Sequence, residues 1–284
     1  MVPLAKRIFH FFVFSNLFIA CCAVLMAYQT NLLLIGVPPT FNFSGFVFFA
    51  TLCSYSFHWF LTPDIEDIDS VRLKWLIRNR RVHLVLLLLG VAGVGYFGFY
   101  LLPHWKNLLI VAVATFLYSA PKIPHPIFQS LRKVALGKTI FLAFVWMFVT
   151  TVLPIQVSDT PWRFNFTLFA ISRFFLVYAI CILFDYRDRE YDRSIGIRSL
   201  ITWLSEKGIL YLYVFSLLIF GVTTLLLLKF GWNYQTVGLC IIPGVVLTFV
   251  YRYAIRNFSD ILFYFYLDGL MALSALLTTF LIRN

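Results

Sequence analysis

Charged residues are scarce in this sequence. Only 12% of its 284 residues are Asp, Glu, Lys or Arg, whereas 61% are hydrophobic and the mean hydropathy is +0.88. A soluble domain carries about 25% charged residues. The scarcity of charge therefore excludes a soluble globular domain, and it predicts an all-α integral membrane protein with several membrane crossings.

Acidic residues are rarer still, with 12 Asp and Glu against 23 Lys and Arg, for a net charge of +11. In a soluble chain this excess would indicate a nucleic-acid partner. In a membrane protein the topology explains it, so we expect no nucleic acid. Lys6 and Arg7 precede an apolar run that is able to span a bilayer, and no small-residue cleavage site follows it, so we expect no removable signal peptide.

Cysteine is also sparse, and its placement excludes two classes of site. None of the five shows metal-binding spacing or a paired framework, which argues against a zinc site and a disulfide scaffold. All lie within or beside apolar runs, as small packing residues do. They are Cys21, Cys22, Cys53, Cys181 and Cys240.

Long apolar runs are abundant. A membrane-spanning helix needs about 20 apolar residues. By that length the sequence predicts a single polytopic domain over 1–284, a bundle of about nine transmembrane helices. The expected spans are 8–27, 41–61, 82–102, 107–119, 138–155, 164–184, 208–229, 235–252 and 260–282.

The basic residues distribute unequally between the two sides that these spans define. The N-terminus and the even-numbered connections hold 18 Lys and Arg, and the opposite side holds Lys106, Arg163, Lys229 and Arg283. The positive-inside rule then places the N-terminus and the loops 62–81, 120–137 and 185–207 in the cytoplasm. We expect a multi-pass protein of a bacterial cell membrane.

The loop 62–81 predicts an amphipathic helix on the cytoplasmic surface. It opens with Thr62, Pro63 and Asp64, which are typical of a helix start, and apolar residues recur behind them at helical spacing. Its basic residues are placed to meet anionic headgroups of membrane lipids. These are Arg72, Arg78, Arg80 and Arg81.

The loop 185–207 contains the main candidate site. Asp185, Asp188 and Asp192 follow the spacing i, i+3, i+7, so on a helix they share one face. Clustered carboxylates without Cys or His suit Mg²⁺ rather than Zn²⁺. A second interpretation remains open, in which Arg187, Arg189 and Arg193 neutralise the acids in a solvated loop.

Two segments resemble the UbiA-type intramembrane prenyltransferases. The stretch from Asp185 to Leu200 reads DYRDREYDRSIGIRSL, which is similar to the second aspartate motif of that family, D-x-x-D-x-x-x-D followed by Arg, Gly and Thr/Ser-Leu. Tyr118 to Lys122 reads YSAPK and matches the family's Y-x-x-x-K. The neighbourhood from Arg132 to Lys138, with Trp146, Thr150 and Pro154 beyond, is similar as well.

The resemblance implies a helical bundle around a central cavity and a Mg²⁺-dependent transfer of a prenyl group. A prenyl diphosphate would be the donor, and a lipophilic molecule in the membrane would be the acceptor. Asp185, Asp188 and Asp192 would be the catalytic, metal-binding residues. The family's substrate-binding positions correspond to Tyr118, Lys122, Arg132, Lys138 and Arg189.

The family's first aspartate motif, N-D-x-x-D-x-x-x-D, is not intact. The corresponding stretch Ser54–Asp69 has no leading Asn, and Pro63 interrupts it. Asp64 and Asp67, at i and i+3, would supply one further metal site, or they are only the acidic first turn of a surface helix. His58, within the second expected span, is better read as a buried, hydrogen-bonded side chain.

Three functions therefore remain open: prenyl transfer, a divergent UbiA-like protein that binds a lipid or isoprenoid without transfer, and a divalent-cation transporter. A transporter needs polar residues along a path through the membrane, and the spans offer little beyond Arg173 and Asp268. These two residues lie at similar depths, and buried charges in membranes usually pair. We therefore hypothesise an Arg173–Asp268 ion pair; alternatively, Arg173 faces a cavity and serves the substrate.

Overall fold

The computed structural model describes residues 4–61, 70–120, 123, 138–194 and 199–281. These residues form helices and no strand, which confirms the predicted all-α class. The helices are α1 (Leu4–Phe14), α2 (Leu17–Thr30), η1 (Asn31–Ile35), α3 (Phe41–Phe60), α4 (Val71–Arg78), α5 (Arg80–Phe99), η2 (Leu102–His104), α6 (Trp105–Ser119), α8 (Lys138–Met147), η5 (Phe148–Val152), α9 (Leu153–Val157), α10 (Phe164–Ser194), α11 (Leu200–Trp203), α12 (Glu206–Leu226), η6 (Leu227–Phe230), α13 (Tyr234–Ala254), η7 (Leu262–Leu267) and α14 (Asp268–Leu281).

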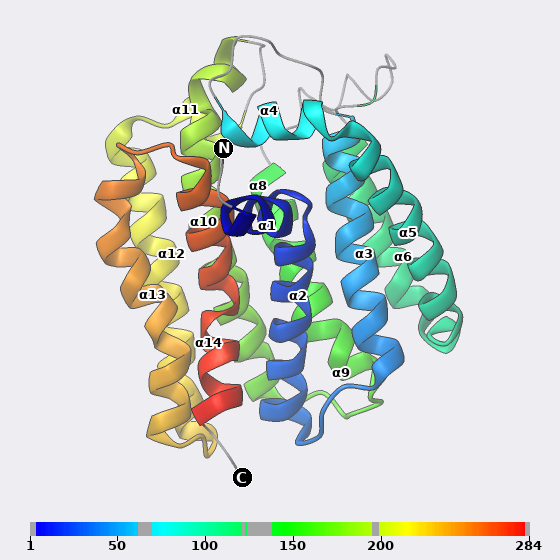
Figure 1. Cartoon of the computed structure of the whole chain (residues 1–284). Coiled ribbons are helices and arrows are strands. Elements are labelled where there is room, and N and C mark those ends of the chain that lie inside the picture. The colour runs from blue at the N-terminus through cyan, green and yellow to red at the C-terminus, as the bar shows by residue number, and fades with distance from the viewer. Residues whose placement is uncertain (1–3, 62–69, 121–122, 124–137, 195–198, 282–284) are drawn as a thin grey trace.

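Within the described residues, seven helical segments are long and apolar enough to cross a membrane: Leu17–Ile35, Arg80–Phe99, Thr139–Val157, Phe164–Ser194, Glu206–Phe230, Tyr234–Ala254 and Leu262–Leu281. The long helices run side by side as a bundle, with α10 near its middle and α4 lying across one end (Figure 1). We call this the α4 end. Helices α3 and α6 occupy the two remaining expected ranges, but α6, with 15 residues, is short for a span.

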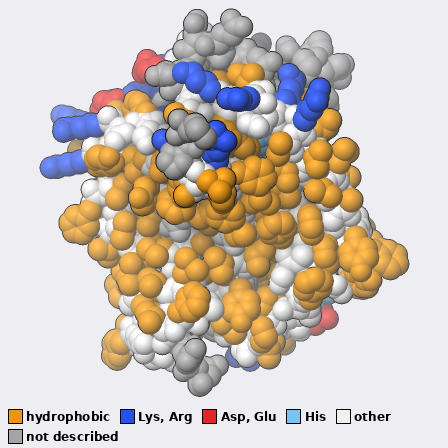
Figure 2. Space-filling view, viewed as in Figure 1, with side chains coloured by type: hydrophobic (Ala, Val, Ile, Leu, Met, Phe, Trp, Pro, Cys, Tyr) orange, Lys and Arg blue, Asp and Glu red, His pale blue; other side chains and the backbone are white. Residues whose placement is uncertain are grey.

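The surface of the bundle matches an apolar surrounding. Hydrophobic side chains cover the middle of the face in Figure 2, and Lys and Arg gather toward the α4 end. Large apolar residues such as Leu88, Leu218 and Phe249 are 60%, 61% and 79% exposed. An exposed belt of this size is typical of a lipid-facing surface. The structure thus supports a multi-pass membrane protein.

The first expected span, 8–27, is wrong at its start. Helix α1 ends at Phe14, and Asn16 adopts the left-handed conformation with φ 69° before α2 begins. Asn tolerates this conformation better than most residues. Its side chain is also fixed, because Asn16 accepts a hydrogen bond from Arg72 Nη2 (2.8 Å) and donates one to Ser56 Oγ (3.4 Å). Helix α1 therefore lies across the bundle near the α4 end instead of continuing α2 (Figure 1).

The loop assignment for 185–207 is also wrong. Helix α10 continues to Ser194, so the three aspartates lie on a helix, and α11 follows from Leu200 to Trp203. Charged residues at i and i+3 support this extension, as shown by the Glu190–Arg193 ion pair at 3.0 Å. The surface helix expected within 62–81 is present as α4, with Ser70 as its N-cap, while its expected start at 62–64 lies outside the described residues.

Helices α3 and α5 approach each other closely through a glycine. A Cβ at Gly90 would lie 2.8 Å from Cys53 Cα and 2.9 Å from its backbone nitrogen, whereas a Cβ at Gly95, on the same helix, would meet nothing within 4 Å. Backbone atoms cannot move aside as a side chain does. The two glycines therefore give a matched pair for measuring this helix contact.

We expect Gly90→Ala to destabilise the protein by about 1–3 kcal/mol, because the added methyl overpacks the α3–α5 contact. Gly95→Ala should instead be neutral or stabilise by up to about 1 kcal/mol through helix propensity. Thermal unfolding of both variants in detergent checks this. Equal melting temperatures for the two variants would show that the contact is not tight.

Candidate functional site

The aspartates of α10 lie at the α4 end in different environments. Asp185 and Asp192 are buried, with 7% and 4% exposure, whereas the Asp188 side chain is 42% exposed. Asp185 points toward α8, where the Thr139 hydroxyl donates a hydrogen bond to Asp185 Oδ2. Asp185 and Asp188 are neighbours on one helical face. Their carboxylates therefore lie at the boundary between the bundle interior and its surface.

Arg187 lies between the aspartates and η7. Its Nε forms an ion pair with Asp188 Oδ1 at 2.9 Å, and its Nη2 donates to the Tyr264 hydroxyl at 2.8 Å. The guanidinium carbon is 4.6 Å from the centre of the Phe263 ring and 4.9 Å from that of Tyr264. The sequence suggested Arg187 only as a neutralising charge. The structure instead places it in a half-enclosed aromatic site.

Arg72 reaches the same site from α4. It is only 3% exposed, and its guanidinium carbon lies 4.3 Å from the Trp59 ring centre and 3.7 Å from the Tyr264 ring centre. Its expected contact with lipid headgroups is therefore wrong, although Arg78, Arg80 and Arg81 are exposed as predicted. Helical spacing did not separate Arg72 from these neighbours, because all of them are basic residues in one short amphipathic stretch.

The inward position of Arg72 affects its own pKa, and it is accompanied by hydrogen bonds that hold the start of α4. Burial lowers the pKa of the Arg72 guanidinium from its ordinary value, and the nearby Arg187 charge lowers this pKa further, while Tyr264 and Asp268 oppose the shift. Asp260 fixes the start of α4, because its Oδ2 accepts from Ser70 Oγ (2.9 Å) and from the Arg72 backbone nitrogen (2.8 Å). Asp268, 8% exposed, lies close enough to act electrostatically on both arginines.

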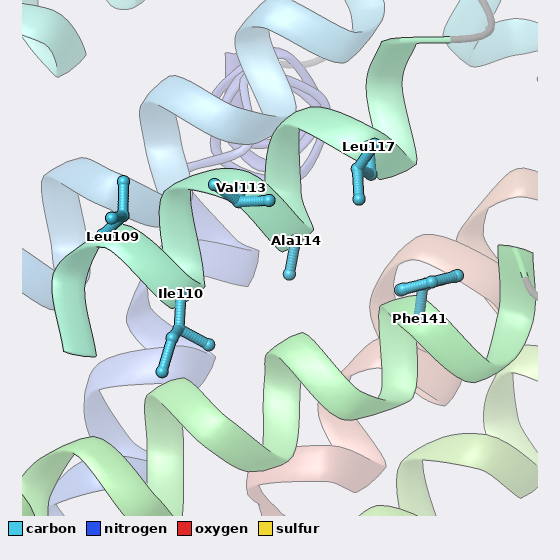
Figure 3. Close-up of a pocket in the computed structure, with 6 residues that line it drawn as sticks. All are labelled: Leu109, Ile110, Val113, Ala114, Leu117 and Phe141. Carbon is cyan, nitrogen blue, oxygen red and sulfur yellow. The ribbon is translucent and has the colours of Figure 1, made fainter. Parts of the chain in front are cut away.

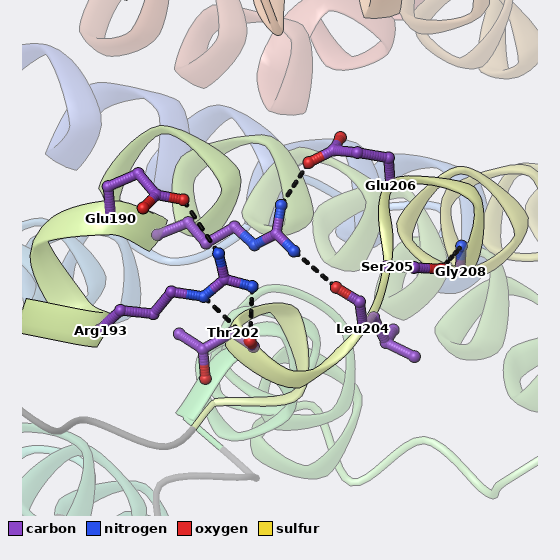
Figure 4. Close-up of polar contacts among 8 residues, drawn as sticks. Glu190, Arg193, Thr202, Leu204, Ser205, Glu206 and Gly208 are labelled. Carbon is purple, nitrogen blue, oxygen red and sulfur yellow. Dashed lines mark hydrogen bonds and ion pairs between the residues drawn. The ribbon is translucent and has the colours of Figure 1, made fainter.

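Arg189, predicted to bind substrate, has structural partners here. Its Nη1 pairs with Glu206, and its Nη2 donates to the Leu204 carbonyl at 2.6 Å (Figure 4). Arg193 follows one turn later and donates to the Thr202 carbonyl through Nε (3.1 Å) and Nη2 (2.9 Å). These contacts connect the end of α10 to α11 and to the start of α12. They brace the helix that carries the aspartates.

We expect Arg189→Met to destabilise the protein by about 2–3 kcal/mol, because it removes a charged hydrogen bond and leaves the Leu204 carbonyl without its donor. The matched control is Glu190→Gln, which breaks an exposed ion pair on the same helix and should cost less than about 1 kcal/mol. Chemical unfolding of both variants in detergent compares them. Similar losses in the two would contradict the bracing role.

The other predicted site residues are placed as follows. The Tyr118 ring stacks on His58, with centroids 5.0 Å apart, and Ser119 Oγ is 3.5 Å from His58 Nδ1. His58 is thus hydrogen-bonded as expected, but it is half-buried and not fully buried. Lys138 begins α8, but its side chain lies outside the described part of the structure. So do four further predicted residues: Asp64, Asp67, Lys122 and Arg132.

The described side chains do not form a multi-ligand metal cluster. Among them, no group of three or more His, Cys, Asp or Glu lies close enough to hold a metal ion. Mg²⁺ needs only one or two protein carboxylates when phosphate oxygens and water supply the rest. Asp185 and Asp188 are enough for such a shared site. The described residues do not supply the three or more side chains that a site built from protein ligands alone would need.

Arg173 and Asp268 do not pair, so the hypothesis of an ion pair between them is wrong. Arg173, 4% exposed, donates from Nη2 to Gln29 Oε1 at 2.8 Å. Gln29 in turn donates to Thr278 Oγ1 (3.2 Å) and accepts from Ser274 Oγ (3.3 Å). Asp268 instead lies near Arg72 and Arg187 at the α4 end. The two residues, expected at similar depths, thus belong to separate polar clusters.

We expect the losses in stability of Arg173→Leu and Asp268→Leu to add within about 0.5 kcal/mol, because the two side chains share no partner. Arg173→Leu combined with Gln29→Leu should instead show a coupling of about 1 kcal/mol or more. Thermal unfolding of the single and double variants gives both numbers. Coupling between positions 173 and 268 would contradict this arrangement.

An apolar groove lies between α6 and α8 on the outer side of the bundle. It has a volume of about 380 Å³ and is lined by Leu109, Ile110, Val113, Ala114, Leu117 and Phe141 (Figure 3). Most of these side chains are well exposed, so the groove opens toward the membrane. Thr139, which contacts Asp185, lies two residues before Phe141. The predicted central cavity stays a prediction.

Comparison with known proteins gives no match to this chain, whether with protein-family models, with curated proteins or with solved structures.

Proposed function

We propose that this protein is a divergent UbiA-type prenyltransferase, which transfers a prenyl group from a prenyl diphosphate to a lipophilic acceptor within the membrane. The observation that carries the proposal is that Asp185 and Asp188 lie at the same end of an apolar helical bundle as the buried cations Arg187 and Arg72, with Asp188 paired to Arg187. The similarity of the stretch Asp185–Leu200 to the family's second aspartate motif supports it.

The proposal includes the topology. Helices α3 and α6 would join the seven long apolar helices to give nine spans, as the sequence predicts. The excess of Lys and Arg on one side would place the α4 end in the cytoplasm of a bacterial cell. The donor would then enter from the cytoplasmic side, with its tail toward the membrane interior.

Each described residue has a defined task in this function. Asp185 and Asp188 would hold Mg²⁺ together with diphosphate oxygens, and the bound ion would stabilise the negative charge that develops on the leaving group. Arg187 would donate hydrogen bonds to the same charge. Rings such as Phe263 and Tyr264 would exclude water and stabilise a developing allylic cation. The intact first motif of the family is missing, so Asp64 and Asp67 would supply at most one further site.

A second candidate function is binding of a lipid or isoprenoid without transfer. It is favoured by the contacts that already engage the two carboxylates, since Thr139 donates to Asp185 and Arg187 pairs with Asp188. A metal would have to compete with Arg187 for Asp188. Turnover separates the two candidates, because only a transferase releases inorganic diphosphate when donor, acceptor and Mg²⁺ are combined.

We expect Asp185→Asn and Asp188→Asn each to reduce Mg²⁺-dependent binding of farnesyl diphosphate at least tenfold, which corresponds to about 1.4 kcal/mol. The physical reason is the loss of one of two protein carboxylates from the ion. Titrations in lipid nanodiscs, with and without Mg²⁺, measure the metal-dependent part. Glu190→Gln, an exposed acid on the same helix, is the control and should bind as the unmodified protein does. Unchanged Mg²⁺ dependence in both Asp variants would refute the metal site.

A further inference from the structure

Two arginines from distant parts of the sequence converge on one aromatic ring. The guanidinium carbons of Arg72 and Arg187 lie 3.7 Å and 4.9 Å from the centre of the Tyr264 ring. The charges are close enough to repel, and both are largely removed from water, with 3% exposure for Arg72 and 13% for the Arg187 side chain. Two like charges in a low-dielectric site are costly unless an anion compensates them.

The hydrogen-bond donors of the two arginines are not all used. Arg72 Nη2 donates to Asn16, but Arg72 Nε is buried and has no acceptor among the described residues. Arg187 uses Nε and Nη2 for Asp188 and Tyr264, whereas its Nη1 is likewise buried without a described acceptor. A buried polar group without a partner calls for an explanation, and an unseen ion is one of the usual ones.

The nearby carboxylates do not satisfy these donors. Asp260 accepts from the Arg72 backbone nitrogen and from Ser70. Asp188 contacts Arg187 but is 42% exposed. Asp268 is buried near both arginines, and within the described part of the chain it forms no ion pair with either. Among the described residues, the Arg72 guanidinium therefore contacts a neutral amide and two aromatic rings.

We infer that Arg72 and Arg187, whose guanidiniums both lie against the Tyr264 ring, form a metal-independent clamp for the phosphate head of a lipid-borne ligand. Phosphate suits the clamp because it offers several acceptor oxygens and nearly two negative charges, and the guanidinium fork matches its geometry. The clamp adds Arg72 to the proposed function, and it gives Arg187, which lies between two aspartates of the second motif, a role in phosphate binding that does not need the metal. It rests on that function only for the isoprenoid tail, because phosphate capture requires neither Mg²⁺ nor transfer.

The proposed clamp offers an explanation for the altered first aspartate motif. Arg72 follows directly after that stretch and reaches the site that also holds Arg187 and Asp188. In the proposed clamp, arginine charge supplies part of the phosphate binding that a second metal ion would otherwise provide. Arg72 and Arg187 would thus be binding residues, and their packing contacts with Tyr264 of η7 would be an additional role.

The test uses full-length protein in zwitterionic nanodiscs with EDTA, so that no divalent metal contributes. Farnesyl diphosphate is titrated against farnesol, which has the same tail and no phosphate. We expect the diphosphate to bind at least tenfold more tightly than farnesol. Arg72→Met and Arg187→Met should each remove most of that difference and leave farnesol binding unchanged. Arg78→Met, an exposed arginine on α4, should keep it.

Conservative variants separate a loss of binding from a loss of folding. Arg72→Lys and Arg187→Lys keep the charge but lose the planar fork, so we expect folded proteins with an intermediate loss of diphosphate binding. Unfolding temperatures measured in parallel identify any variant that is merely unstable. Equal losses of farnesol and farnesyl diphosphate binding in the folded variants would show a packing role only, and would overturn the clamp.

Competition identifies the source of the phosphate. Displacement of farnesyl diphosphate by dioleoyl phosphatidate indicates that the clamp accepts a phospholipid headgroup, and displacement by inorganic diphosphate indicates that it accepts the head without a tail. Either supports a phosphate clamp. No preference for farnesyl diphosphate over farnesol in EDTA would overturn it. If farnesyl diphosphate binds once Mg²⁺ is added, such a result leaves the proposed transferase intact. Conversely, a protein that prefers farnesyl diphosphate in EDTA but releases no diphosphate with Mg²⁺ and acceptor counts against the transferase and not against the clamp.

Discussion

Burial of arginine in an apolar bundle is the constraint on which the rest of this structure depends. A charged side chain in a low-dielectric interior must find acceptors, aromatic faces or an opposite charge. Arg72 meets this need by inserting from α4 between Trp59 and Tyr264 and by donating to Asn16. That single insertion fixes α4 across the bundle and sets the sharp turn between α1 and α2.

The same constraint separates the molecule into two polar centres. At the α4 end, Arg72 and Arg187 share Tyr264 with the aspartates of α10 close by. Deeper in the bundle, Arg173 is held by Gln29, which Ser274 and Thr278 support. The first centre holds both signs of charge, whereas the contacts described for Arg173 are with neutral groups. Only the first centre therefore combines the chemistry of a phosphate site with carboxylates that suit a hard metal ion.

The end of α10 shows how a functional face is kept in place. Arg189 and Arg193 alternate with the aspartates. From the sequence, both could be neutralising charges, and Arg189 could also be a substrate ligand. In the structure they bind carbonyl groups at Thr202 and Leu204 and the carboxylate of Glu206. The helix thus directs one set of side chains toward the candidate site and another toward its own support.

The sequence by itself determined the helical class, the approximate positions of most long apolar segments and the placement of Asp185, Asp188 and Asp192 on one face, because these follow from hydropathy and helical spacing. Only the tertiary structure decided which charges meet. Arg72 turned inward while Arg78 stayed exposed, Arg187 joined Tyr264, and Arg173 paired with Gln29 instead of Asp268. Spacing fixes a residue's position around its own helix axis, but the partner it meets depends on how helices distant in sequence are rotated and packed against one another.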